Sequence, residues 1–301
     1  MAQKTSSCVL HRGADGPRKL NLNPESGLLV RSQPASQKPG PIPPEWILPS
    51  GIRADFTESE LAQTPTRDWR WELNQLEYVI GKEDRIEVDA PGQWPYSAHG
   101  LIITTFPNGR SYIGSGTVIH SRHVLTAAHN LYSAARGGWA QDVVFVPGKC
   151  GDSEPFGQFM AVRCLCPSEY IEGLKPAFHD YGVLVLHRDV APQTGAYGLK
   201  VLSTSELSGC PVTIVGYPGE PSLGSGRKQW LGQNRIHTVS DELVTYQVDT
   251  SAGESGSGVY IQADSEYLIV AIHTVGSMLG NQGVRVNMQV FQACQEWMSL
   301  S

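Results

Sequence analysis

The chain has 301 residues, of which 40% are hydrophobic and 17% charged, and its formal net charge at pH 7 is -6. Such a composition is typical of a soluble globular protein, and no cluster of Lys and Arg in the sequence favours a nucleic-acid partner. No apolar run approaches the roughly 18 residues that a membrane-spanning helix needs, so we expect no membrane partner. The N-terminus is polar and shows no secretory signal as written.

Residues 1–78 differ from the rest of the chain because prolines crowd between residues 32 and 49. Proline at this density prevents strand ladders and helix interiors. The prolines concerned are Pro34, Pro39, Pro41, Pro43, Pro44 and Pro49. We predict a mostly disordered leader or pro-segment over residues 1–78, with a plain disordered tail as the alternative, and a folded domain over residues 79–301.

From about residue 97 the sequence changes to short β-branched runs that are broken by Gly, Pro and Asn. The lengths of these runs and the turn residues between them are typical of an antiparallel all-β sandwich or barrel. The predicted strands are 100–106, 112–119, 142–146, 181–187, 212–216, 243–248, 258–262 and 267–273. Apolar spacing over residues 288–298 predicts one amphipathic C-terminal helix.

The six cysteines are too few for a disulfide-dense scaffold and too scattered for a zinc site. Cys164 and Cys166 form a C-x-C pair, and Cys150 lies nearby in the sequence. One local disulfide across this loop and reduced buried thiols are both compatible with that spacing. We expect no bound metal ion.

A glycine-rich hexapeptide, GESGSG, spans residues 253–258. A serine hydroxyl is a poor nucleophile at neutral pH, and it needs a neighbouring base and a tight turn that exposes its oxygen. Glycines on both sides of Ser255 allow such a turn, and they let the N–H groups of Gly253 and Ser255 point at one spot that can hold an oxyanion. The alternative is a polar turn without a catalytic role.

Two further motifs offer partners for this serine. A strand-like run ends in two alanines and His129, and such small neighbours let a ring sit against a crowded centre. Asp180 directly precedes an apolar strand, where a carboxylate can be partly dehydrated. Taken singly, the histidine is more often structural than catalytic, and the aspartate is more often a turn or cap residue.

The order of the three motifs is more specific than any one of them. His129, Asp180 and Ser255 follow each other in the order that chymotrypsin-type barrels use. An α/β-hydrolase would place the serine first, and only His273 follows Ser255 here. The combination predicts a nucleophilic Ser255, with His129 as its general base and Asp180 as the residue that orients His129.

Residues 79–297 resemble a trypsin-like serine protease of the chymotrypsin fold, and more closely the bacterial glutamyl endopeptidases. The matching motifs are residues 126–129 for the histidine, 180–183 for the aspartate, 253–257 for the serine, 79–81, 84–85 and 95–96 for the mature N-terminus, and 215–219 for a core strand and turn. The resemblance implies an all-β fold of two antiparallel six-stranded β-barrels, with the triad in the cleft between them and hydrolysis through an acyl-enzyme.

Three positions depart from the family pattern without removing a catalytic group. Asn130 stands where many relatives have a cysteine, so the disulfide that clamps the histidine loop is missing. Gly258 replaces the usual proline after the serine motif. Glu254 replaces a residue that is Asp in animal enzymes and usually an amide in the glutamyl group.

The residues expected in the specificity pocket favour different substrates. In the family, Thr250 lies on the pocket wall, and His273 occupies the position where glutamyl endopeptidases bind the substrate carboxylate. Asp249 stands where trypsin-type enzymes bind Lys or Arg. We predict cleavage after Glu or Asp, because some glutamyl enzymes resemble this sequence at Asp249 and Thr250. The alternatives are Lys/Arg specificity through Asp249, an inactive protease-like binding module, and an esterase on the same barrels.

The leader suggests a zymogen. Cleavage between Tyr78 and Val79 would free an α-amino group, which could pair with Glu254 as in animal relatives or help to neutralise the bound carboxylate as in glutamyl relatives. The resemblance also implies secretion, a polypeptide substrate and the absence of any metal or organic cofactor, and we expect a monomer.

Overall fold

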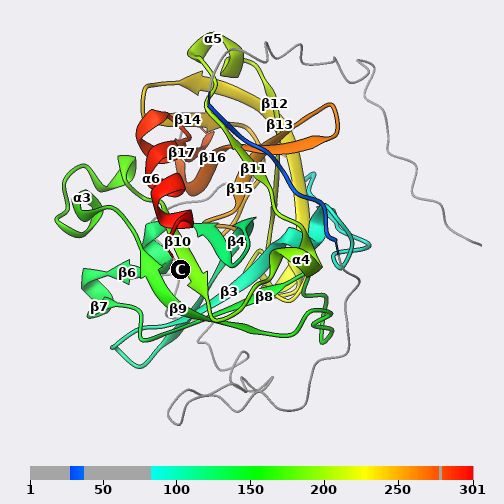
Figure 1. The fold of residues 1–301 in the computed structure, drawn as a ribbon, viewed down its shortest axis with the longest axis vertical. Coiled ribbons are helices and arrows are strands. Elements are labelled where there is room, and N and C mark those ends of the chain that lie inside the picture. The colour runs from blue at the N-terminus through cyan, green and yellow to red at the C-terminus, as the bar shows by residue number, and fades with distance from the viewer. Residues whose placement is uncertain (1–27, 37–82, 278–279, 301) are drawn as a thin grey trace, which may run out of the picture.

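The computed structural model describes residues 28–36, 83–277 and 280–300. Two closed six-stranded antiparallel barrels form most of this part of the chain (Figure 1). This confirms the predicted all-β fold with two barrels. The predicted boundary at residues 78 and 79 lies outside the described residues and stays a prediction.

The first barrel closes in the strand order β10-β5-β4-β3-β8-β9. Its strands are β3 (His99–Thr105), β4 (Ser111–His120), β5 (His123–Thr126), β8 (Asp142–Pro147), β9 (Phe159–Leu165) and β10 (Gly182–Leu186). Leu125, Phe145 and Leu184 are fully buried in its interior. Burying a side chain of this size contributes about 1.5–3 kcal/mol.

The second barrel is closed by the pairing of its last two strands, β16 and β17. Its strands are β12 (Pro211–Gly216), β13 (Trp230–Val239), β14 (Leu243–Tyr246), β15 (Gly258–Ala263), β16 (Glu266–Ser277) and β17 (Gly280–Arg285). The short strand β2 (Ile86–Glu87) pairs with β13, and β11 (Gly198–Lys200) pairs in parallel with β16. A separate two-stranded sheet joins β6 (Tyr132–Ser133) to β7 (Gly138–Trp139).

Part of the predicted leader lies against this second barrel (Figure 1). β1 (Leu29–Val30) pairs antiparallel with β11, and Gln33 exchanges two backbone hydrogen bonds of 2.7 and 2.6 Å with Ala196. Gly198 permits the close approach, because a Cβ there would lie 2.1 Å from the carbonyl oxygen of Val30. Residues 28–36 therefore extend the sheet of the second barrel.

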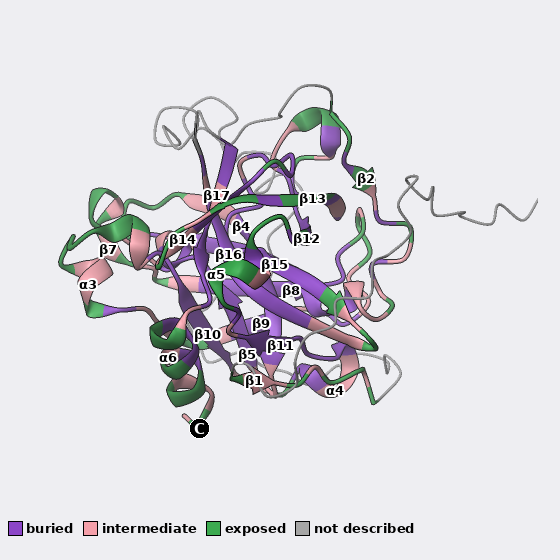
Figure 2. Cartoon of the chain, turned by 90° about the horizontal axis from the view of Figure 1, so that it is seen from above, coloured by how far each residue is buried: buried purple, intermediate pink, exposed green. Residues whose placement is uncertain are grey.

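The helices of the described chain are short apart from the last one. They are the α-helices α3 (Ser168–Ile171), α4 (Ala191–Thr194), α5 (Thr204–Leu207) and α6 (Met288–Met298), and the 3-10 helices η1 (Tyr96–Ala98), η2 (Ala128–Asn130), η3 (Ala134–Arg136), η4 (Pro176–Phe178) and η5 (Pro221–Leu223). α6 has the predicted bounds, and Asn287 caps its N-terminus by accepting from the Val290 N–H at 3.0 Å. Phe291 and Cys294 of α6 are buried in a hydrophobic cluster that includes side chains of both barrels. Figure 2 shows α6 at the edge of the molecule, with exposed residues along its outer side.

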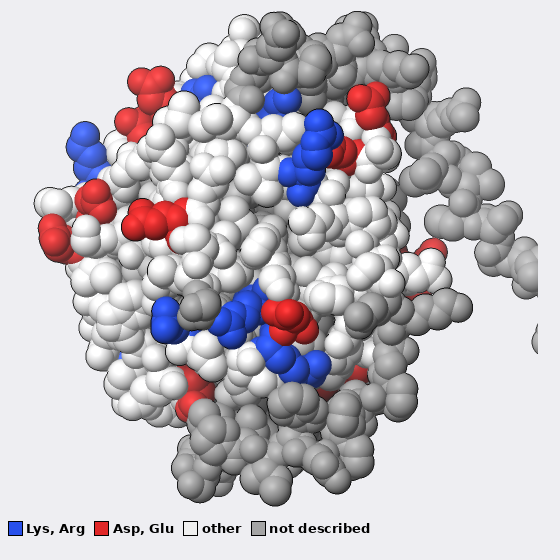
Figure 3. Space-filling model, viewed as in Figure 1, with Lys and Arg blue, Asp and Glu red and all other residues white. Residues whose placement is uncertain are grey.

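All eight predicted strands are present, with bounds that shift by a few residues. β5, β9, β13 and β17 are barrel strands that are absent from that prediction. On the face shown in Figure 3, basic and acidic side chains are interspersed. Within the described residues no helix is long and apolar enough to cross a membrane.

The five cysteines in the described part of the chain are free thiols, namely Cys150, Cys164, Cys166, Cys210 and Cys294. The local disulfide considered for the loop around Cys164 is therefore not formed in this structure. Burial raises the pKa of Cys164 and of Cys166 to about 12, so both thiols are protonated at neutral pH.

Candidate active site

His129 and Asp180 are held together by two hydrogen bonds. β5 ends at Thr126, the next turn carries His129, and β10 pairs with β5 so that Gly182 lies opposite Thr126. This register brings the carboxylate that precedes β10 to the turn. Asp180 Oδ1 accepts from the His129 N–H at 2.9 Å, and Oδ2 lies 2.7 Å from His129 Nδ1.

This pair is largely removed from water, since the side chains of His129 and Asp180 are 16% and 7% exposed. A carboxylate only accepts hydrogen bonds, so it favours the tautomer with the proton on Nδ1. In that tautomer Nε2 has a lone pair and can accept a proton. The arrangement is the one that a general base needs.

Ser255 lies where the two barrels meet. Its carbonyl oxygen accepts from the N–H of Ser115 on β4 at 2.9 Å, and its Oγ donates to the carbonyl oxygen of Thr274 on β16 at 3.2 Å. The next residue, Gly256, donates its N–H to the carbonyl oxygen of His273 at 2.7 Å. The serine loop is therefore hydrogen-bonded to both barrels.

Glycine at residue 256 lets the serine loop approach the histidine loop. Gly256 has a φ of +94°, and a Cβ there would lie 2.2 Å from Thr126 Oγ1 and 2.9 Å from Ala127 N. Any larger residue would push the two loops apart, and the L configuration disfavours this φ. The small residues of both motifs thus allow the serine loop and the histidine loop to approach each other closely.

Asn130 connects the two loops by hydrogen bonds. Its side chain is buried, and Nδ2 donates to the carbonyl oxygen of Ser255 at 2.9 Å and to Thr126 Oγ1 at 3.0 Å. Gly114 leaves room for it, since a Cβ there would lie 2.5 Å from Asn130 Nδ2. The residue that replaces the family cysteine therefore secures the histidine loop without a disulfide.

The backbone before Ser255 is shaped by Gly253. Its φ is +101°, and a Cβ there would lie 2.5 Å from the carbonyl oxygen of Tyr217. The Gly253 carbonyl accepts from Ser115 Oγ at 2.8 Å, and the same hydroxyl accepts from the Tyr217 N–H at 2.9 Å. Among the described residues the Gly253 N–H donates to no backbone carbonyl.

The predicted specificity residues Thr250 and His273 are both fully buried. His273 Nδ1 lies 2.6 Å from the hydroxyl of Tyr246 on β14, a neighbour that the sequence did not indicate. Thr250 Oγ1 has no hydrogen-bond partner within the described part of the chain. A buried hydroxyl without a partner costs about 1–3 kcal/mol.

Asp249 contacts the segment that precedes the first barrel. Its Oδ2 accepts from the N–H of Asp84 at 3.2 Å, and the residue is 2% exposed. Burial and the neighbouring Asp249 raise the pKa of Asp84, since two carboxylates at close range disfavour a second negative charge. The carboxylate of Asp249 therefore already has a partner within the protein.

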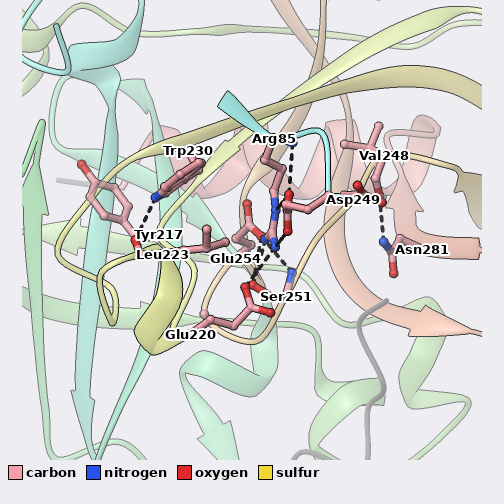
Figure 4. A network of polar contacts seen from close by, with 12 residues as sticks. Arg85, Tyr217, Glu220, Leu223, Trp230, Val248, Asp249, Ser251, Glu254 and Asn281 are labelled. Carbon is pink, nitrogen blue, oxygen red and sulfur yellow. Dashed lines mark hydrogen bonds and ion pairs between the residues drawn. The ribbon is translucent and has the colours of Figure 1, made fainter. Parts of the chain in front are cut away.

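A buried cation lies directly behind the serine loop (Figure 4). The guanidinium of Arg85 contacts the carboxylates of Glu83, Glu220 and Glu254, and its side chain is 0% exposed. This network was not predicted from the sequence. The only signal for it was the resemblance of residues 84–85 to the mature N-terminus of glutamyl endopeptidases.

No group of three or more His, Cys, Asp or Glu side chains among the described residues is arranged to hold a metal ion.

Comparison with known proteins places this fold and site in a family. A family model described as a trypsin-like peptidase domain matches residues 114–272. The chain is 32% identical over 232 residues to the glutamyl endopeptidase of Bacillus licheniformis, covering 74% of this chain and 69% of that protein. It is 29% identical over 221 residues to an extracellular metalloprotease of Bacillus subtilis, covering 73% and 69%.

A solved structure of a Glu endopeptidase in complex with MPD is similar in fold. Its TM-score is 0.65 at 24% sequence identity, and the match covers 74% of this chain and 100% of that one. The family model spans more than half of the 301 residues. The chain therefore belongs to the trypsin-like peptidase family, whose members act on polypeptides, and it is a serine-type endopeptidase.

Proposed function

We propose that the chain hydrolyses peptide bonds with Ser255 as the nucleophile, His129 as the general base and Asp180 as the residue that orients His129. The observation that carries the proposal is the doubly hydrogen-bonded pair of His129 and Asp180, on a turn that Asn130 joins to the Ser255 loop. The chain order of the three residues is also that of chymotrypsin-type enzymes.

In this mechanism His129 takes the proton of Ser255 while the hydroxyl oxygen attacks the scissile carbonyl. Asp180 keeps the other ring proton on Nδ1 and stabilises the imidazolium that forms. His129 then returns the proton to the leaving amine, and water hydrolyses the acyl-enzyme by the same route. Each step needs only side chains of this chain and water.

The N–H groups of Gly253 and Ser255 are the proposed donors to the oxyanion. A donor of this kind typically contributes about 3–4 kcal/mol to the transition state. Two features of Gly253 support this role: its positive φ and the hydrogen bond that its carbonyl accepts from Ser115 Oγ. Together they fix the orientation of the peptide groups on either side of Gly253.

We also propose a preference for Glu, or Asp, at the cleavage position. Thr250 offers a buried hydroxyl that has no partner in the part of the chain that the structure describes. A hydroxyl of Tyr246 that donates to His273 Nδ1 would leave a donor on Nε2. Together they would supply two donors to a carboxylate. The name of the Bacillus licheniformis relative, glutamyl endopeptidase, agrees with this preference.

The contacts of Asp249 argue against the trypsin-like alternative. A Lys or Arg pocket needs a carboxylate that is available to the substrate cation. Asp249 instead accepts from the Asp84 N–H and lies beside the Asp84 carboxyl group.

A serine-reactive fluorophosphonate probe tests the proposed nucleophile and separates it from an inactive binding module. The wild-type chain should be labelled, and Ser255→Ala should not. Ser257→Ala is the matched control, because this neighbouring serine is also buried and has no assigned role. Equal labelling of wild type and Ser255→Ala would refute the assignment, and a casein assay beside an ester assay would separate a protease from an esterase.

Matched chromogenic peptides that differ only in Glu, Asp, Lys or Arg at the cleavage position test the preference. We expect kcat/KM to be highest for Glu, and His273→Ala to lower it selectively for Glu. A faster reaction with Lys or Arg would establish the alternative through Asp249.

We also propose that the protein is secreted and is a monomer. The Bacillus subtilis relative is named an extracellular protease, which supports secretion. Activity in the culture medium and a size of one chain by light scattering would test both points.

A further inference from the structure

Arg85 lies in surroundings that favour its charged form. Its guanidinium donates to Glu83 from Nε at 2.8 Å and from Nη2 at 2.6 Å, to Glu220 from Nη2 at 3.0 Å, and to Glu254 from Nη1 (Figure 4). A guanidinium with 0% exposure would be very costly without such partners. Burial acts to lower the pKa of Arg85, but the hydrogen bond with Glu83 and the charges of Glu254, Glu83 and Glu220 raise it.

The same guanidinium holds the loop that carries the nucleophile. Arg85 Nη1 donates to Ser251 Oγ at 2.8 Å as well as to Glu254 Oε2. Glu254 Oε2 also accepts from the Ser251 N–H at 2.8 Å, and the Glu254 N–H donates to the Ser251 carbonyl at 3.0 Å. At the other end, the Ser257 N–H donates to the Glu254 carbonyl at 3.0 Å. The position of Arg85 therefore fixes residues 251–257 as a unit.

Glu254 is the acid that a freed α-amino group of Val79 would meet in the zymogen hypothesis. Its side chain is only 1% exposed, and Arg85 and Ser251 already contact its Oε2. This carboxylate therefore already has a buried cation and a backbone N–H as partners. The charge that activation would bring is thus already present within the chain.

We infer that Arg85 performs the task of a freed α-amino group: it neutralises Glu254, positions the oxyanion donors, and makes the chain active without cleavage of the leader. Arg85 is in these terms a positioning residue, because it acts on the substrate only through the serine loop. The inference depends on the proposed role of Ser255.

Steady-state kinetics of the full 301-residue chain test the inference with Arg85→Met, which removes the charge but keeps most of the stem. We expect kcat on a Glu peptide to fall by about 10²–10³-fold with KM within about threefold of wild type, as for loss of an oxyanion donor. The affinity for a peptide boronic acid, which occupies the oxyanion site, should fall in proportion. Arg85→Lys should recover at least about tenfold of the lost kcat, since it restores a cation.

Lys228→Met is the matched control. Lys228 lies just before β13 of the second barrel, and like Arg85 it pairs with a carboxylate, that of Glu87 at 2.9 Å. Its side chain, however, is 44% exposed. Its loss should leave kcat and boronate affinity unchanged. If Arg85→Met does not fold, Glu254→Ala removes the carboxylate through which Arg85 contacts the serine loop, and the same fall in kcat is expected.

Intact mass spectrometry of the fluorophosphonate-labelled protein tests the second half of the inference. The label should appear on the uncleaved chain at the same rate as on a chain processed at Tyr78. Labelling of the processed chain alone, or an Arg85→Met or Glu254→Ala protein with the kcat of Lys228→Met, would overturn the inference. A wild-type chain that never reacts with the probe would instead overturn the proposed function on which it depends.

Discussion

The side-chain amide of Asn130 donates a hydrogen bond of 2.9 Å to the carbonyl oxygen of Ser255. This bond joins the turn of the proposed general base to the loop of the proposed nucleophile, which lie in different barrels. The same nitrogen donates to Thr126 Oγ1, so the amide bridges the two loops.

Asn130→Ala should therefore reduce both stability and activity. Loss of the two hydrogen bonds should lower the free energy of unfolding by about 1–3 kcal/mol. Looser placement of the base against the nucleophile should lower kcat by about 10–100-fold. Urea unfolding and steady-state kinetics measure the two effects. Asn108→Ala removes an exposed Asn that donates to Tyr112, and it should change neither quantity.

Asp180→Asn should lower kcat by about 10⁴-fold, as the equivalent change does in trypsin-type enzymes, because an amide favours the wrong tautomer of His129. KM should change little, since Asp180 does not contact the substrate. The matched control is Asp152→Asn, at a carboxylate that is 81% exposed and pairs with Arg227. A kcat within tenfold of wild type would show that the carboxylate is not needed to orient the ring.

Thr250→Val should raise stability while it lowers activity on Glu peptides. The valine methyl group fills the space of a buried hydroxyl that has no partner among the described residues, which removes a penalty of about 1–3 kcal/mol. The same hydroxyl is a proposed donor to the substrate, so kcat/KM for Glu should fall by about tenfold or more. Thr117→Val is the control, because Thr117 Oγ1 accepts from the Gly258 N–H and its loss should destabilise the protein.

His99 should make the protein less stable in acid. It is buried between the barrels with Nδ1 3.1 Å from Thr117 Oγ1, and burial lowers its pKa from 6.5 to about 3. Below pH 6.5 the unfolded chain binds a proton at His99 that the folded chain does not bind. The contribution of neutral His99 to the free energy of unfolding is therefore fully present above pH 6.5, and it is lost as the pH falls from 6.5 to about 3. The slope is at most about 1.4 kcal/mol per pH unit.

His99→Gln removes this proton and should flatten the pH dependence of the free energy of unfolding between pH 6 and pH 4. His237→Gln, at an exposed position, should leave the dependence as in wild type. Identical slopes for wild type and His99→Gln would contradict the assignment of the proton to His99.

The strands that could be predicted are those whose own side chains fill a barrel. β10 is buried at every position, and its apolar run is visible in the sequence. β13 has only two buried residues, Gly232 and Ile236, and β17 buries the polar side chain of Asn281. These strands form because of their pairing partners rather than an apolar pattern of their own, which is why the sequence does not reveal them.

The proposed site also has one part that the sequence indicates and another part that it does not. The motifs of His129 and Asp180 are local, and in the structure His129 Nδ1 lies beside Asp180 Oδ2. The network of Arg85 depends on carboxylates up to 169 positions away in the sequence, and a charged residue in a polar segment is usually solvated. Only the three-dimensional pairing with Glu254 distinguishes this arginine from a surface residue.

The pairing of β1 with β11 has a consequence for any chain that begins at residue 79. Without residues 28–36, backbone groups of Leu199 and Ala196 face solvent on an open sheet edge, which is a ready template for another chain. Such a truncated protein should therefore oligomerise through β11. A synthetic peptide of residues 28–36 should rebind by strand addition and restore the single-chain size.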